Sequence, residues 1–188
     1  MKANNWMNEN KDSRLKGAVR LLGGSVVLGA LLFSAGCAHT YVPKESKYKT
    51  DTIPMYKVGS LVEFKNGQPN TEEILYAENM GHDFFADLHD WTDKAIAIAD
   101  RELTERGSKT AGKPGHTLTL RVSWVEVSTG TWGFRGMLTL DAATGTGFAK
   151  SFHGEAPSAN IYNASSGALG AAVTKMLSDP QIIQYLSQ

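Results

Sequence analysis

The sequence predicts an α+β fold in which two main helices pack on one face of an antiparallel sheet, with the element order roughly β-α-β-β-β-α. Two observations predict the helices, because apolar residues recur with a helical period over residues 82–106 and again over 165–177. A third observation predicts the sheet, since residues 117–152 contain three runs of alternating apolar and polar residues separated by glycine-containing turns.

The segment before the first long helix predicts one strand and leaves the next element open. Residues 60–64 alternate in part and precede a turn-forming stretch at 65–69, so we expect a short strand there. Asn70 and Glu73 have the spacing of a helix capping box, whereas the apolar residues that follow could equally form a strand. The sequence therefore leaves residues 71–80 undecided.

The central helix is expected over residues 82–106 and should end at Gly107, where glycine accommodates a left-handed cap. Its apolar residues form one broad arc that a sheet must cover. These residues are Phe84, Phe85, Leu88, Trp91, Ala95, Ile96, Ile98, Ala99 and Leu103.

Four aspartates recur beside this arc and predict an acidic stripe on the helix: Asp83, Asp87, Asp90 and Asp93. The stripe could bind a basic partner surface or a divalent cation, and we name all four as possible partner-binding residues. It could also be an ordinary solvated face, because aspartates are favourable near a helix start and Lys94 can pair with Asp90.

The histidines give no metal-binding pattern. His82 and His89 would share a face of the helix, but two helical zinc ligands usually stand four residues apart, not seven. We therefore predict neither a metal site nor a cofactor.

The three expected strands are joined by two hairpin turns. In the first strand, which should be half-buried, Leu118, Leu120, Val122 and Trp124 should all point to one face. Trp132 lies in the turn at 128–133 and is either an exposed partner contact or a core residue. The turn at 141–147 contains two glycines and fits a hairpin rather than a phosphate-binding loop.

The C-terminal region predicts the second main helix over 165–177, whose small residues allow close approach to a neighbour. A last short helix should follow, with Asp179 as its cap and Pro180 in its first turn.

The first 36 residues have the layout of an export signal, with basic residues followed by an uncharged apolar run from Leu21 to Gly36. Ser34-Ala35-Gly36-Cys37 resembles the lipobox of bacterial lipoproteins, although Ser34 stands where leucine is usual. The resemblance implies cleavage between Gly36 and Cys37 and a lipid, such as palmitate, on the Cys37 thiol. Cys37 could instead be an unmodified cysteine in an ordinary signal peptide or a membrane anchor.

This resemblance also implies a subcellular location and a domain organisation. Ala38 lacks the aspartate that commonly retains such lipoproteins at the inner membrane, so the expected location is the outer membrane, with the protein facing the periplasm. We expect a lipidated cysteine and flexible tether over 37–58, followed by a single domain over 59–188. Cys37 is the only cysteine, so no internal disulfide can form.

Three features within residues 74–186 stand out: Phe84-Phe85-Ala86-Asp87, the paired strands with Ser128-Thr129-Gly130, and Ala171-Ala172-Val173 followed by Leu177. With them, this region looks like small outer-membrane lipoproteins of the YajG type and, more loosely, like the amino-terminal domain of TolB. It implies the fold but no defined activity.

These patterns favour a non-catalytic envelope accessory or assembly factor that binds a protein partner through a sheet edge or the acidic stripe. An alternative is a lipoprotein that holds a small apolar ligand in a groove lined by Trp91, Trp124 and phenylalanines. No nucleophile elbow, paired carboxylate motif or complete metal motif predicts an enzyme. Without the expected signal, 14 of the 19 basic residues and 17 of the 19 acidic residues remain, so nothing predicts nucleic-acid binding.

Overall fold

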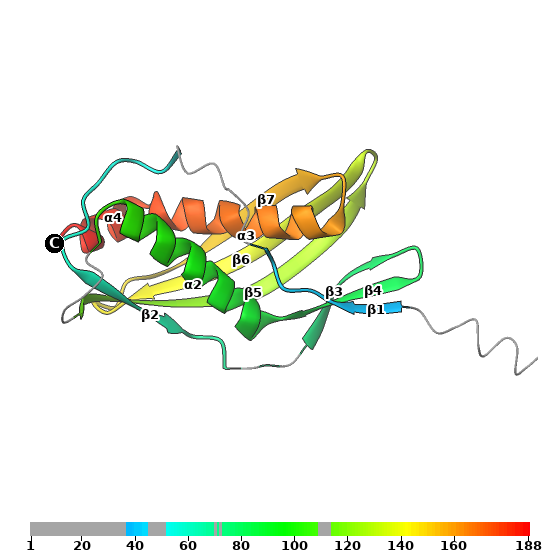
Figure 1. Cartoon of the computed structure of the whole chain (residues 1–188), viewed down its shortest axis with the longest axis horizontal. Coiled ribbons are helices and arrows are strands. Elements are labelled where there is room, and N and C mark those ends of the chain that lie inside the picture. Colours follow the sequence, from blue (N-terminus) through cyan, green and yellow to red (C-terminus); the bar gives the residue numbers. More distant parts are fainter. Residues whose placement is uncertain (1–36, 45–51, 70, 72, 109–113) are drawn as a thin grey trace, which may run out of the picture. The chain divides into compact units, whose positions relative to one another are not determined.

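A computed structural model describes residues 37–44, 52–69, 71, 73–108 and 114–188, and the fold is α+β (Figure 1). The chain divides into two units, Met1–Cys37 and Ala38–Gln188, and the elements described below belong to the second unit or begin at its boundary. They are β1 (Cys37–Thr40), β2 (Leu61–Asn66), β3 (Glu73–Asn79), β4 (His82–Asp87), α2 (Leu88–Glu105), β5 (Pro114–Gly130), β6 (Gly133–Thr144), β7 (Ala149–Ser158), α3 (Ile161–Leu177) and α4 (Pro180–Leu186). Within the described ranges, no helix is long and apolar enough to cross a membrane.

The main sheet has four strands in the order β2-β5-β6-β7, and α2 and α3 lie on one face of it (Figure 1). The β5-β6 and β6-β7 pairs are antiparallel, as expected, but β2 pairs with β5 in parallel. The sheet is therefore mixed rather than purely antiparallel. The physical reason is the long connection through β3, β4 and α2, which returns the chain to β5 running in the same direction as β2.

A second sheet of three strands, in the order β1-β4-β3, corrects the expected start of the central helix. Residues 82–87 form β4, and α2 begins only at Leu88. Asp87 caps α2 by accepting hydrogen bonds from the backbone N–H of His89 (2.7 Å) and of Asp90 (3.3 Å), so strand and helix join without a loop. Phe84 fits both patterns, since it falls on the helical arc and also alternates with the buried Ala86 as in a strand.

The β3–β4 hairpin decides the open region at 71–80 in favour of a strand. Its turn consists of Met80 (φ 49°) and Gly81 (φ 79°), both in the left-handed region. Such mirror-image turns match the twist of paired strands and normally use asparagine or glycine. Met80 therefore holds a backbone conformation that methionine rarely adopts.

The expected tether is wrong where the structure describes it. Residues 37–40 form β1, and the Tyr41 N–H donates to the Phe85 carbonyl at 3.1 Å. The buried Trp91 indole N–H donates to the Tyr41 carbonyl at 2.8 Å, which gives this segment a reason to dock. Ile53 and Val58 are also buried, at 4% and 6% exposed. Residues 45–51 of the expected tether lie outside the described residues.

A β-bulge in β5 corrects the expected orientation of Trp124. Leu118, Leu120 and Val122 are buried as expected, but the register with β6 shifts between Val122 and Trp124. Beyond the shift the buried residues are Val125 and Val127. One extra residue reverses which side chains face the core, so Trp124 lies on the face away from the helices, 42% exposed.

Helix α3 packs directly on β6 and β7 because small residues line the contact. A Cβ built at Gly136 would overlap the Ala164 carbonyl oxygen, and one at Gly154 would overlap that of Ala168. The helix starts at Ile161, four residues before the expected position, with Asn160 as its cap. The short last helix is confirmed, with Asp179 as cap and Pro180 in the first turn.

Candidate interaction surfaces

The face of the main sheet opposite the helices is open to solvent and carries Trp124. In register across β5, β6 and β7, Trp124 stands beside Thr139 and Thr139 beside His153. The Thr139 hydroxyl and His153 Nδ1 are 3.0 Å apart and share a hydrogen bond. The row therefore presents a half-exposed indole held by a rigid sheet.

Charged and polar pairs flank this row on both sides. Toward the β5–β6 turn, Arg135 Nε donates to a Glu155 carboxylate oxygen at 2.7 Å. Toward the other end, the Ser151 hydroxyl donates to Asp141 at 2.6 Å, beside a hollow of about 550 Å³ that Arg121 also lines. An aromatic centre with a polar rim is the usual composition of a protein-binding surface.

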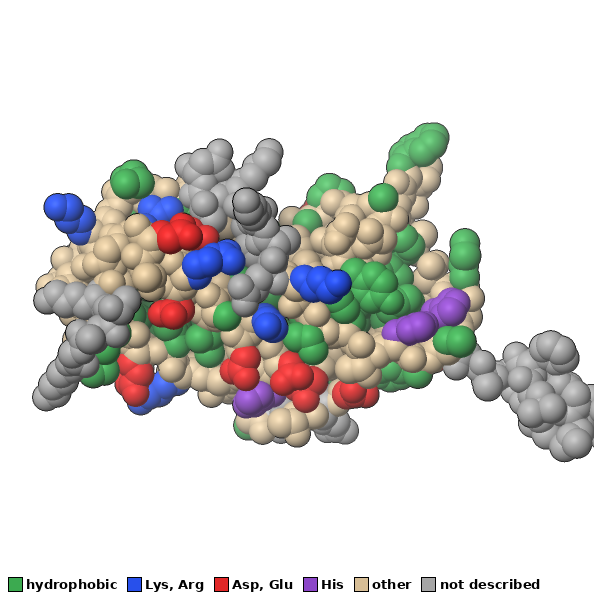
Figure 2. Space-filling model, in the orientation of Figure 1, with side chains coloured by type: hydrophobic (Ala, Val, Ile, Leu, Met, Phe, Trp, Pro, Cys, Tyr) green, Lys and Arg blue, Asp and Glu red, His purple; other side chains and the backbone are tan. Residues whose placement is uncertain are grey.

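Trp132 lies at the tip of the β5–β6 hairpin with 96% of its surface exposed, so it is an exposed residue and not part of the core. It borders a hollow of about 530 Å³ that Phe134, Arg135 and Pro157 also line. Met80, at the tip of the β3–β4 hairpin, is 92% exposed. Figure 2 shows apolar side chains standing out at both hairpin ends.

The four aspartates do not form one stripe. Asp83 is in β4, opposite Glu78 of β3, and Asp87 is the cap of α2. Asp90 and Asp93 do share the first turns of the helix, as expected. The structure thus brings together only half of the predicted surface.

His89, Asp90 and Asp93 form a cluster whose ligand-type atoms lie within 4.8 Å of one another. Asp93 already accepts a hydrogen bond from the Asn66 side-chain amide at 2.6 Å and lies 3.7 Å from His89 Nδ1. Contacts within the protein therefore account for the positions of His89 and Asp93. His82 is in β4 and does not share a helix face with His89; its Nδ1 is 2.9 Å from His39 Nε2.

The outer edge of β7 is partly blocked as a site for an added strand. Pro157 has no N–H to donate, and Lys175 Nζ already donates to the His153 carbonyl at 2.8 Å. Natural proteins use proline and lysine in this way to prevent strand addition. This edge is therefore a weaker candidate surface than the open face of the sheet.

The expected groove for an apolar ligand does not form. Trp91 is completely buried and packs against Tyr76, with ring centroids 5.4 Å apart, while Trp124 lies on the opposite face of the sheet. The two tryptophans cannot line one cavity.

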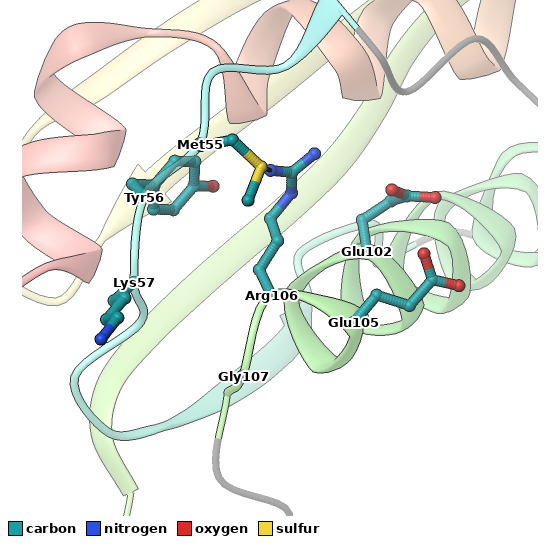
Figure 3. Close-up of a pocket in the computed structure, with 7 residues that line it drawn as sticks. All are labelled: Met55, Tyr56, Lys57, Glu102, Glu105, Arg106 and Gly107. Carbon is teal, nitrogen blue, oxygen red and sulfur yellow. Dashed lines mark hydrogen bonds between the residues drawn. The ribbon is translucent and has the colours of Figure 1, made fainter.

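A different hollow, of about 660 Å³, lies between residues 55–57 and the C-terminal end of α2 (Figure 3). The Arg106 guanidinium sits 5.7 Å from the centre of the Tyr56 ring, and its Nη1 donates to the Pro54 carbonyl at 3.1 Å. Burial raises the pKa of Tyr56 to about 12, against the opposing effect of the Arg106 charge. Lys57, Glu102 and Glu105 add charged groups to its lining.

Cys37, the expected lipidation site, is exposed. Gly36, on the other side of the expected cleavage site, lies outside the described residues together with the rest of 1–36. Trp124 is the candidate residue that sequence reasoning missed, because a β-bulge leaves no reliable signal in an alternating pattern.

No family model matches the chain, and no curated protein matches it. Among solved structures, the chain is similar to protein XCC0632 from Xanthomonas campestris, which is described by the family model DUF330. The two share 16% sequence identity at a TM-score of 0.47, and the match covers 74% of this chain and 90% of that protein.

Proposed function

We propose that this protein is a non-catalytic domain of the bacterial cell envelope, anchored by a lipid on Cys37, that acts as an accessory or assembly factor by binding another envelope protein. The signal-like residues 1–36 and the lipobox-like sequence before Cys37 support the anchor. The proposed location is the periplasmic side of the outer membrane.

The observation that carries partner binding is the open face of the main sheet. Its centre is the half-exposed Trp124, and tryptophan is among the residues that contribute most to binding when a partner covers them. The surrounding pairs, such as Arg135 with Glu155, are exposed and contribute little to folding, but they can select a partner of complementary charge.

Cross-linking in living cells tests this surface. A photo-reactive amino acid placed at position 124 should yield an adduct with a discrete envelope protein. The same group at Glu105, an exposed position on α2, should yield none. Equal adducts from both positions, or none from 124, would contradict the proposed surface.

A substitution gives an independent measurement. Trp124→Arg should lower recovery of the partner at least about tenfold, equivalent to about 1.4 kcal/mol of binding. Its free energy of unfolding should stay within about 0.5 kcal/mol of the parent, because the side chain is outside the core. Unchanged recovery of the partner would count against a contact at Trp124.

The anchor has its own test. Cys37→Ala should remove metabolic labelling with palmitate and abolish fractionation with outer membranes, because the thiol is the proposed attachment point. A variant that still carried label or still separated with outer membranes would refute lipid attachment at Cys37.

A further inference from the structure

We propose that the β3–β4 and β5–β6 turns form a membrane-contacting end, with Met80 and Trp132 entering the headgroup region of the bilayer that holds the anchor. This inference rests on the proposed lipid at Cys37. It adds a second contact with the membrane, made by the folded domain itself.

The position of β1 brings the first turn to the membrane. His39 is beside His82, and Tyr41 bonds to Phe85, so β1 and β4 run in the same direction. Because His39 is beside His82, the start of β1, two residues earlier, lies level with the Met80–Gly81 turn. A lipidated Cys37 would stand one residue, about 3.8 Å along the chain, before Ala38. No slack would separate this end of the domain from the bilayer.

The second turn lies at the same end of the domain. Tyr162, at the start of α3, has its ring centre 5.8 Å from that of Phe84 in β4. Ser158, just before α3, pairs with Phe134 at the start of β6, next to the β5–β6 turn. Figure 1 shows both hairpins at the end opposite α4.

The chemistry of the two tips suits a membrane surface. Residues 79–81 and 130–133 carry no charge, and their large side chains, Met80 and Trp132, are 92% and 96% exposed. Tryptophan prefers the boundary between headgroups and acyl chains, where the ring is buried and its N–H stays hydrated. Met80 holds a left-handed conformation that favours glycine or asparagine, so the fold maintains an apolar tip at a conformational cost.

Charges just behind the tips limit the depth of entry. Glu78 and Asp83 face each other directly behind the first turn, and Arg135 lies behind the second. Carboxylates and guanidinium groups remain in water, so the contact should be shallow, roughly 5 Å into the headgroup boundary. Two separate apolar points also fit a flat, fluid surface better than a shaped protein groove, which would need one continuous patch.

Fluorescence quenching tests the contact. The full lipidated protein is reconstituted into vesicles of phosphatidylethanolamine with a minority of phosphatidylglycerol, both with brominated acyl chains. Cleavage before Cys37 leaves Trp91, Trp124 and Trp132 as the tryptophans. We expect a blue-shifted, quenched emission whose quenching is lost in Trp132→Phe and retained in Trp124→Phe.

A second pair of variants separates the tip from general hydrophobicity. Met80→Asp should reduce the quenching of Trp132, because a carboxylate would hold that end in water. Met55→Asp should leave the quenching unchanged. Met55 is 90% exposed, but it lies beside the C-terminal end of α2, away from the two hairpin turns.

The outcomes distinguish this inference from the anchor. A protein that floats with the vesicles but shows no Trp132-dependent quenching overturns the membrane-contacting end and leaves the anchor standing. A protein that does not float at all refutes both.

Discussion

At the scale of single residues, His116 is a buried titratable group whose neutral form the fold favours. It is 8% exposed, and its ring packs edge-on against Tyr185 with centroids 4.7 Å apart. The Tyr185 hydroxyl in turn accepts a hydrogen bond from the Thr117 N–H at 2.8 Å. Burial lowers the pKa of His116 below its usual value of 6.5.

A lowered pKa makes folding stability depend on pH in a defined direction. The folded state disfavours the charged ring, so this contribution is fully present above pH 6.5 and is lost as the pH falls below that value. We expect the urea midpoint of the parent to fall between about pH 7 and pH 5 by more than that of His116→Phe.

His153→Gln is the matched control, because His153 is exposed. It should keep the pH dependence of the parent. A His116→Phe variant with the same pH dependence as the parent would show that His116 is not responsible.

The residues of β5 show how far an alternating pattern predicts burial. The burial of Leu118, Leu120 and Val122 follows from strict alternation, and the structure agrees. Trp124 breaks the pattern because a bulge depends on pairing with the neighbouring strand, which no local sequence contains. Alternation alone therefore predicts Trp124 on the same face as Val122, and the bulge places it on the other face.

At the scale of elements, the contact between α3 and β7 depends on the absence of a side chain at Gly154. We expect Gly154→Ala to lower the free energy of unfolding by about 1–3 kcal/mol, because its Cβ would meet the backbone of α3. Chemical denaturation followed by circular dichroism measures the change.

Gly130→Ala provides the control within the same sheet. A Cβ at Gly130 would meet nothing nearer than the Gly133 carbonyl oxygen at 3.6 Å, an ordinary contact. Its free energy of unfolding should stay within about 0.5 kcal/mol of the parent. Equal effects at the two positions would argue against close helix packing as the reason for Gly154.

Elements with their own local signals were predictable. The hairpins carry glycine turns, and the last helix carries Asp179 and Pro180. The β3–β4 hairpin was missed in part because residues 82–87 satisfy a helical and a strand period equally. Pairing with β3 and β1, which the local pattern cannot reveal, decides between them.

At the scale of the whole molecule, the order of main elements and the α+β class followed from the sequence. The start of the domain did not, because residues 38–44 show no regular period and acquire their structure from β4 and Trp91. The conformation of a short segment that docks on an existing surface is determined by tertiary contacts, which the local sequence pattern does not predict.

A linker insertion tests whether closeness of the domain to the anchor matters. About ten Gly and Ser residues, with alanine first, inserted directly after Cys37 would span roughly 17 Å on average. The protein should still float with vesicles, but the lipid quenching of Trp132 should fall. Undiminished quenching would mean that the tips reach the membrane without help from a short connection.

The pairing of β1 with β4 would also set the reach of the domain from the proposed lipid on Cys37. β1 is only 4 residues long. If it left the sheet, residues 38–52 could extend to at most roughly 50 Å. The hydrogen bonds of this short strand, together with that between the Trp91 indole and the Tyr41 carbonyl, would therefore separate a domain held at the membrane surface from one with a much longer reach.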